Sequence, residues 1–122
     1  MKLGFDLGSR NIHYVALEDS TIIAEESVEH QGDILGKIQS LIQAARQRFG
    51  AVENCGITGN IAANTFRLVD PVLASIRANR FLNTGCRHIL SIGCETFMLI
   101  FLDEEGHYIE HALSSDCASG TG

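Results

Sequence analysis

Three residues near the N-terminus combine chemical groups that bind a phosphate and its metal ion. Asp6 supplies a carboxylate, Gly8 a glycine turn and Ser9 a hydroxyl, and Arg10 follows directly. Backbone N–H groups and a hydroxyl contact phosphate oxygens, and a carboxylate binds the metal or its waters. Short motifs have many chance matches, so on spacing alone an ordinary hairpin with an exposed aspartate is the favoured interpretation.

Two predicted strands position this turn. In residues 3–7, apolar side chains alternate with Gly4 and Asp6, so Asp6 points away from the apolar row. Residues 12–17 are apolar on both faces, which is typical of an inner strand. A polar turn and a further strand at residues 21–28 complete a predicted three-stranded meander.

The clearest helical pattern lies in residues 34–49, where apolar residues recur at helical spacing. Asp33 precedes the pattern as an N-cap, and Gly50 follows it as a residue that ends the helix. The apolar stripe should cover one face of the sheet. Residues 54–59 predict a fourth strand, which should pair in parallel with an earlier strand because a helix precedes it.

The strand plan is repeated in the second half of the chain. Pro71 begins a predicted helix that ends at Phe81. Strands are then predicted at residues 87–92, 96–102 and 107–113. Gly93 and Cys94 stand at the turn of this second unit, where the first unit has Gly8 and Ser9. This repeat predicts two lobes that hold a ligand between them, at residues 1–85 and 86–122, the second cut off soon after it starts.

Composition limits the possible partners and location. The 122 residues suit one domain, or one domain with a piece of another, and a net charge of −6 disfavours nucleic acid and anionic membranes. The longest apolar run, Phe97 to Leu102, is too short to span a bilayer. The N-terminus lacks the apolar run of a signal peptide, so we expect a cytoplasmic protein.

The cysteines and paired histidines carry weaker signals. The four cysteines form no Cys-x-x-Cys pair, and Cys55 and Cys86 fit small buried apolar residues. Cys117 lies in a glycine-rich tail, where a lone cysteine is usually a free thiol. His107 and His111 should share one strand face, but no third ligand is near, so a half-exposed face is favoured over a metal site.

The two-lobe plan resembles the actin, sugar-kinase and heat-shock-chaperone superfamily, whose lobes have a ribonuclease-H-like α/β fold with a mixed sheet. Within it, the chain is most similar to the ATP-dependent activators of 2-hydroxyacyl-CoA dehydratases and benzoyl-CoA reductases. Residues 4–9 resemble the first phosphate loop of that family, residues 57–59 its Thr-Gly turn, and residues 92–95 its second phosphate loop. Residues 116–122 are similar to the segment that supplies a cysteine ligand to an iron–sulfur cluster.

The resemblance implies a homodimer that binds ATP or ADP with Mg²⁺ and holds one [4Fe–4S] cluster, with Cys117 as a ligand. ATP hydrolysis would drive a low-potential electron into a CoA-ester dehydratase or reductase. No catalytic residue is implied. The implied nucleotide phosphate and metal residues are Asp6, Gly8, Ser9, Arg10, Gly93 and Cys94.

Several residues depart from the family pattern. In the second loop, Ser91, Cys94 and Thr96 replace an Asp, a Gly and another Asp, while Arg10 and His13 replace a small residue and a Lys in the first. Two fewer carboxylates would weaken metal binding. The alternative is therefore a diverged relative that binds nucleotide, or acts as a scaffold, without catalysis, and whether the chain is an enzyme stays open.

Overall fold

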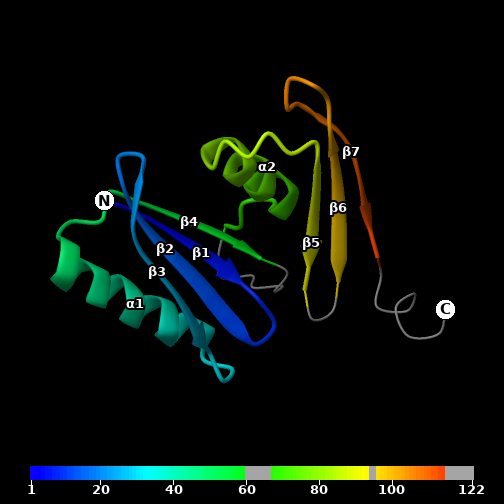
Figure 1. Ribbon diagram of the computed structural model, residues 1–122. Coiled ribbons are helices and arrows are strands. Elements are labelled where there is room, and N and C mark those ends of the chain that lie inside the picture. The colour runs from blue at the N-terminus through cyan, green and yellow to red at the C-terminus, as the bar shows by residue number, and fades with distance from the viewer. Residues whose placement is uncertain (60–66, 94–95, 115–122) are drawn as a thin grey trace. The chain divides into compact units, whose positions relative to one another are not determined.

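The computed structural model describes residues 1–59, 67–93 and 96–114 (Figure 1). The chain divides into two compact units, Met1–Val69 and Asp70–Gly122. Each unit contains one β-sheet and one helix among its described residues. This division falls before the second helix, whereas the sequence predicts a lobe boundary after it, at residue 85. The helix goes with the second unit because its buried side chain, Ile76, packs on the second sheet.

The first sheet has four strands in the order β3-β2-β1-β4. The β1–β2 and β2–β3 pairs are antiparallel, while β4 pairs in parallel with β1. The parallel pair follows a helix, as the sequence predicted, since a crossover connection is needed to bring such a strand back beside β1. The strands span Lys2–Leu7 (β1), Asn11–Glu18 (β2), Thr21–Glu29 (β3) and Asn54–Gly59 (β4).

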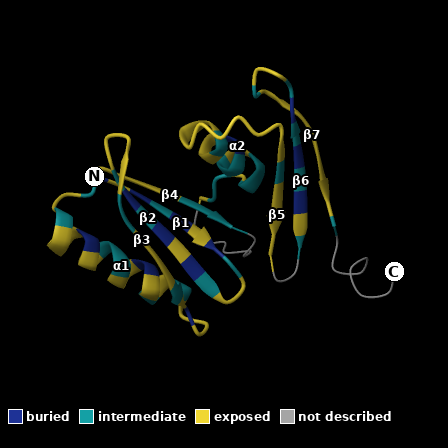
Figure 2. Ribbon diagram, viewed as in Figure 1, coloured by how far each residue is buried: buried dark blue, intermediate teal, exposed yellow. Residues whose placement is uncertain are grey.

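Helix α1, Ile34–Phe49, has the predicted ends. The Asp33 carboxylate accepts a hydrogen bond of 3.0 Å from the Gly36 N–H, and the Gly50 N–H donates to the Arg46 carbonyl at 3.0 Å. Ile38 and Ala45 of α1 are buried together with the apolar row of β1 and β2 (Figure 2). Full burial of one such aliphatic side chain contributes about 2 kcal/mol. The row consists of Leu3, Phe5, Leu7, Ile12, Tyr14 and Ala16.

The second sheet has three antiparallel strands in the order β5-β6-β7. Helix α2 spans Pro71–Phe81, and the Asp70 carboxylate caps it by accepting from the Leu73 N–H at 3.1 Å. Its Ile76 packs with three buried residues of β6, namely Met98, Ile100 and Leu102. The strands span His88–Ile92 (β5), Phe97–Leu102 (β6) and Tyr108–Leu113 (β7).

Large apolar side chains remain exposed on β5 and β6. Leu90, Ile92 and Phe97 have exposed fractions of 60%, 73% and 44%. Ile92 and Phe97 are cross-strand partners, so their side chains stand on the same face of the sheet. None of the described helices is long and apolar enough to cross a membrane.

Candidate functional site

The first hairpin turn is short and closed by a backbone hydrogen bond. Leu7 of β1 and Ile12 of β2 are the last paired strand residues before it. One step further, the Gly8 N–H donates to the Asn11 carbonyl at 2.9 Å. A Cβ atom at Gly8 would lie 3.0 Å from that carbonyl oxygen, so a side chain there would crowd the turn. The turn therefore presents Ser9 and Arg10 at its tip, and both are exposed.

Asp6 lies at the end of β1 on the sheet face opposite the buried apolar row, as its alternation with Phe5 and Leu7 predicted. Its cross-strand partners are His13 on β2 and Thr58 on β4. His13 is in turn paired with Ser27 on β3, so four polar side chains form a row across the sheet. Asp6 is exposed, and no hydrogen bond or ion pair joins its carboxylate to another described residue. Among the described residues, none occupies the Asp6 carboxylate, a group with the chemistry to bind a cation.

The row next to Asp6 on the same face contains two glycines. Gly4 of β1 is paired with Gly56 of β4. A Cβ atom at Gly56 would have no heavy atom within 4 Å, whereas one at Gly4 would lie 3.1 Å from Cγ1 of Val15. Open space therefore lies over Gly56 of β4, where a ligand could approach the backbone closely, whereas the Val15 side chain covers Gly4.

Arg10 already has a partner within the first sheet. Its Nε lies 2.8 Å from the carboxylate of Glu29, the last residue of β3, and both side chains are exposed. An exposed ion pair of this kind contributes about 0–1 kcal/mol. A phosphate ligand would therefore compete with Glu29 for the Arg10 guanidinium at little cost.

The second predicted phosphate turn repeats the backbone pattern of the first. Ile92 and Phe97 are the flanking strand pair, and the Gly93 N–H donates to the Thr96 carbonyl at 2.9 Å. Gly93 thus matches Gly8, and Ser91 on β5 occupies the position that corresponds to Asp6. Ser91 is exposed but carries no charge. Cys94, the other predicted residue of this turn, lies outside the described residues.

The structure gives no evidence on the predicted iron–sulfur ligand, since Cys117 also lies outside the described residues. The expectation that Cys55 and Cys86 are buried is wrong, because both are exposed free cysteines. Cys55 belongs to β4, an edge strand of its sheet, and is not among the residues buried under α1. Although the residue as a whole is exposed, desolvation raises the pKa of the Cys55 thiol, which disfavours the thiolate that a metal needs.

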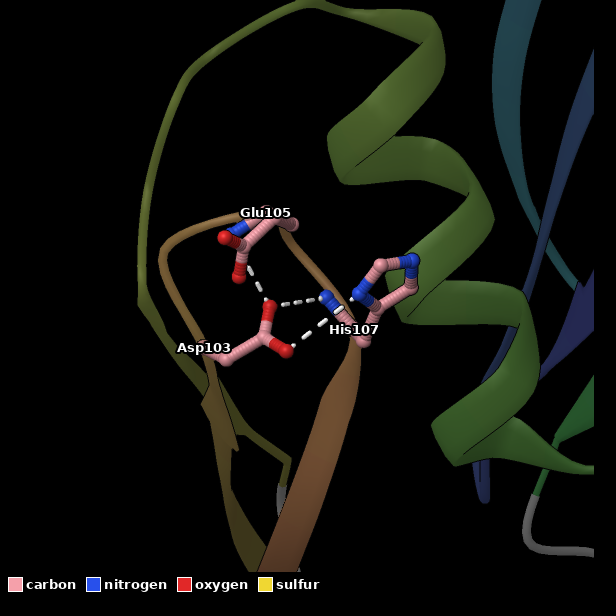
Figure 3. Close-up of side chains that lie close together, drawn as sticks. All are labelled: Asp103, Glu105 and His107. Carbon is pink, nitrogen blue, oxygen red and sulfur yellow. Dashed lines mark hydrogen bonds and ion pairs between the residues drawn. The ribbon is translucent and has the colours of Figure 1, made fainter.

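A group with metal-ligand chemistry, Asp103, Glu105 and His107, lies in the hairpin between β6 and β7 (Figure 3). The Asp103 carboxylate accepts hydrogen bonds from the backbone N–H groups of Glu105, at 3.0 Å, and His107, at 2.7 Å. Its other oxygen lies 3.2 Å from Nδ1 of His107. Both carboxylate oxygens are thus used by the turn itself, as an aspartate that begins a turn commonly does. We interpret the group as a turn cap.

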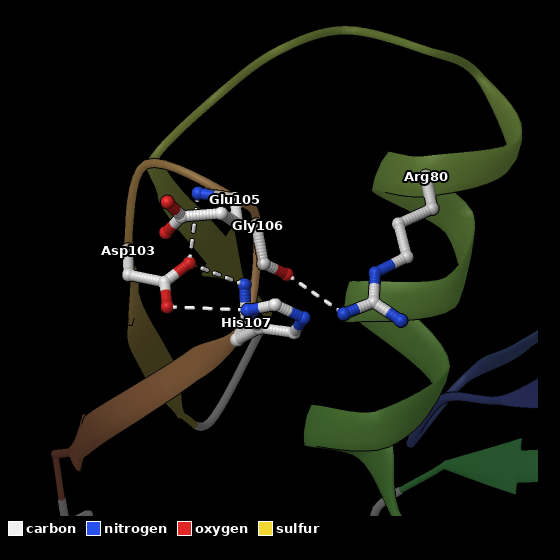
Figure 4. Close-up of polar contacts among 5 residues, drawn as sticks. All are labelled: Arg80, Asp103, Glu105, Gly106 and His107. Carbon is white, nitrogen blue, oxygen red and sulfur yellow. Dashed lines mark hydrogen bonds and ion pairs between the residues drawn. The ribbon is translucent and has the colours of Figure 1, made fainter.

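Arg80 of α2 supports the same hairpin, because its guanidinium donates to the Gly106 carbonyl at 2.9 Å (Figure 4). His107 stands before β7, whereas His111 lies within that strand and its Nδ1 is 2.8 Å from the Tyr108 hydroxyl. The two histidines therefore have separate partners, and His107 lies outside the strand on which both were expected.

One contact of the first turn was missed by sequence reasoning. His30 follows β3 and has an exposed fraction of 7%. Among the described residues, it is the polar residue that is buried. Its Nε2 lies 3.1 Å from the Ser9 carbonyl oxygen. The sequence around His30 does not predict this contact, because the contact depends on the register between β2 and β3.

Comparisons with known proteins identify one curated relative and several solved structures with a similar fold. No family model matches the chain. The uncharacterized protein MJ0004 of Methanocaldococcus jannaschii is 26% identical over 126 residues, which cover 100% of this chain and 51% of that protein. The chain thus spans about half the length of this relative.

Solved structures show the same proportion. The activator of the 2-hydroxyisocaproyl-CoA dehydratase from Clostridium difficile, solved with bound ADPNP, matches with a TM-score of 0.76 and 22% identity, over 99% of this chain and 48% of that chain. Component A of the Acidaminococcus fermentans (R)-2-hydroxyglutaryl-CoA dehydratase matches with a TM-score of 0.79 and 19% identity, over 98% and 49%. The Aquifex aeolicus PPX-GPPA enzyme matches with a TM-score of 0.60 and 14% identity, over 92% and 51%. The chain therefore has the α/β fold of the dehydratase activators, as its sequence resemblance predicted.

Proposed function

We propose that the chain binds the phosphates of ATP or ADP at the turn Gly8–Arg10, with Asp6 directed toward Mg²⁺. The observation that carries the proposal is the matched pair of hairpins. In each, a glycine N–H donates to the backbone carbonyl of the residue three positions later in the sequence. The fold it shares with an activator solved with ADPNP supports the same ligand class. Gly93 and Cys94 of the second turn are the proposed counterpart residues.

The residues present at the first turn fit a magnesium ion. Mg²⁺ usually keeps several waters and takes one or two carboxylates together with phosphate oxygens. Asp6 is an exposed carboxylate without a described partner, and the Ser9 hydroxyl stands at the adjoining turn. In this proposal Asp6 holds the ion or its waters, the turn backbone and Ser9 contact phosphate oxygens, and Arg10 exchanges Glu29 for a phosphate.

For the biological role, we propose an ATP-dependent activator that passes a low-potential electron to a CoA-ester dehydratase or reductase, as a homodimer in the cytoplasm. Its support is the shared fold together with the similarity of residues 116–122 to a cluster-ligand segment. The cluster would supply one-electron chemistry, with Cys117 as a ligand from each chain. A [4Fe–4S] cluster takes about four thiolates, so two copies of Cys117 would provide half of them.

The alternative role is a nucleotide-binding or scaffold protein without hydrolysis. It is favoured by Ser91, which stands in the second hairpin where Asp6 stands in the first, so that the second turn offers no carboxylate at this position. The two roles differ in one measurable product. An activator releases phosphate from ATP, whereas a scaffold binds the nucleotide and leaves it intact.

Calorimetric titration of the chain with ATP, with and without Mg²⁺, tests the binding proposal. We expect metal-dependent binding, weakened about tenfold by Asp6→Asn, because a lost carboxylate contact of about 1.4 kcal/mol corresponds to that factor. Asp19→Asn is the matched control, since it removes the same charge from an exposed residue that lies in the turn after β2. Absence of binding, or equal affinity of the two variants, would contradict the proposal.

A further inference from the structure

We propose that His30 is a positioning residue that orients the turn Gly8–Arg10 for anion binding. This inference rests on the proposed function of that turn. His30 lies between the last residue of β3, Glu29, and the loop that leads to α1. It is buried, although the turn residues that it contacts, Ser9 and Arg10, are exposed. A buried polar side chain beneath an exposed turn can fix the path of the turn without touching a ligand.

The backbone of His30 joins two elements. Its N–H donates to the Arg10 carbonyl at 3.1 Å, which continues the β2–β3 pairing beyond Asn11 and Glu29. Its carbonyl accepts from the N–H of Asp33 at 2.9 Å, and Asp33 is the N-cap of α1. The first turn and the beginning of α1 are therefore held by the same residue.

The hydrogen bonds of the imidazole ring favour one tautomer of its neutral form. The Gly32 N–H donates to Nδ1 at 3.0 Å, so Nδ1 is an acceptor and carries no proton. In the neutral ring the proton then belongs to Nε2, which donates to the Ser9 carbonyl at 3.1 Å. Both ring nitrogens are thus satisfied in one neutral tautomer, and each has a different partner.

These contacts decide which way the peptide groups of the turn face. The Ser9 carbonyl is bound by the His30 ring and the Arg10 carbonyl by the His30 N–H. The chain has no cis peptide bond, and in a planar trans peptide the N–H points opposite to the carbonyl. The N–H groups of Arg10 and Asn11 are therefore directed away from His30. Successive backbone N–H groups that face the same side can bind a phosphate, and in this proposal the two contacts of His30 set that orientation of the turn.

Two substitutions separate the two ring contacts. In His30→Gln the side-chain amide N–H extends to about the reach of Nε2 and keeps a donor for Ser9. In His30→Asn the shorter side chain keeps an acceptor near the position of Nδ1 for Gly32, but its amide N–H does not reach the Ser9 carbonyl. We expect ATP affinity, measured by calorimetry with Mg²⁺, to fall about fivefold to tenfold in His30→Asn, and about twofold or less in His30→Gln. His111→Asn, an exposed histidine of β7, is the matched control.

Two further readouts separate positioning from stability and from the proposed function. Nitrogen-15 NMR of the neutral wild-type ring should show the proton on Nε2 and none on Nδ1, and the other tautomer would overturn the inference. The amide resonances of Arg10 and Asn11 should shift in His30→Asn and stay near wild type in His30→Gln. If wild type does not bind ATP, the proposed function fails while these amide shifts still support or refute the positioning. If both variants lose affinity only in proportion to their lost stability, or neither loses any, the inference is wrong.

Discussion

The lack of space for a side chain at Gly59 gives a sharp prediction for Gly59→Ala. Gly59 is the last residue of β4 and the parallel partner of Leu7. A Cβ atom at Gly59 would lie 2.3 Å from the Leu7 carbonyl oxygen and 2.7 Å from the Leu7 nitrogen. Its φ of +136° is also a conformation that residues with a side chain rarely adopt. The substitution must therefore both separate the strands and strain the backbone.

The expected cost follows from these two effects. An unfavourable backbone conformation costs about 1–3 kcal/mol. Normal contact between a carbon and an oxygen needs roughly 1 Å more than the available 2.3 Å, so the end of the β1–β4 pairing must open. Losing one ladder hydrogen bond costs about 1 kcal/mol more. The sum of about 3 kcal/mol lowers the Tm of a domain of this size by about 12 °C or more.

Thermal and urea unfolding, followed by circular dichroism, measure this cost. Gly56→Ala is the matched control because it lies on the same strand, its Cβ would meet no atom within 4 Å, and its φ is not positive. We expect Gly56→Ala to change the free energy of unfolding by less than about 0.5 kcal/mol. If Gly59→Ala melts within about 2 °C of Gly56→Ala, on the same scale of about 4–8 °C per kcal/mol, the contact between Gly59 and Leu7 is not as close as described.

Two other predictions concern a helix cap and an acid transition. Asp33→Ala removes the acceptor for the Gly36 N–H and should lower the free energy of unfolding by about 1 kcal/mol in urea; an unchanged midpoint would contradict this role. The backbone N–H of His107 holds the pKa of Asp103 below its usual 3.8, so this carboxylate stabilises the fold above pH 3.8, and its contribution is lost as the pH falls through the lowered pKa. Asp103→Asn should therefore reduce the difference in stability between pH 6 and pH 3, measured by urea unfolding, and a difference equal to that of wild type would refute the assignment.

Most helices and strands were predicted because each is marked by nearby residues, such as capping residues or an alternating apolar pattern. Asp33 and Gly50 bound α1 as expected, since a capping carboxylate and a glycine with a φ of +95° act on the helix ends directly. The parallel pairing of β4 followed from its position after a helix. The strand bounds of the second unit differ from the predicted ones by one residue, and the division between the units depends on which sheet α2 packs against. That packing is a tertiary property that the sequence around Pro71 does not specify.

Around the first turn, the sequence indicated the local arrangement of residues and missed the contact that depends on strand pairing. Asp6, Gly8 and Ser9 lie near one another because all three belong to one short hairpin. His30 reaches Ser9 through the pairing of β2 with β3, across 21 positions of sequence. The Asp103 carboxylate is used within its own turn, where it contacts His107. Whether His107 and His111 share a strand depends on where β7 begins, and it begins after His107. The predicted features depend on neighbouring residues, whereas the missed features depend on contacts between different strands and turns.

The two hairpins show why a repeated sequence pattern does not fix burial. Leu7 and Ile12 flank the first turn, and Ile92 and Phe97 flank the second in the same register. Leu7 and Ile12 have exposed fractions of 0%, because α1 packs on their face, whereas Ile92 is 73% exposed. In the second unit α2 packs instead on Met98, Ile100 and Leu102, which alternate with Phe97 along β6 and so belong to the other face. The helix of each unit thus packs on opposite faces of the matching hairpins, and α1 follows its antiparallel strands whereas α2 precedes them.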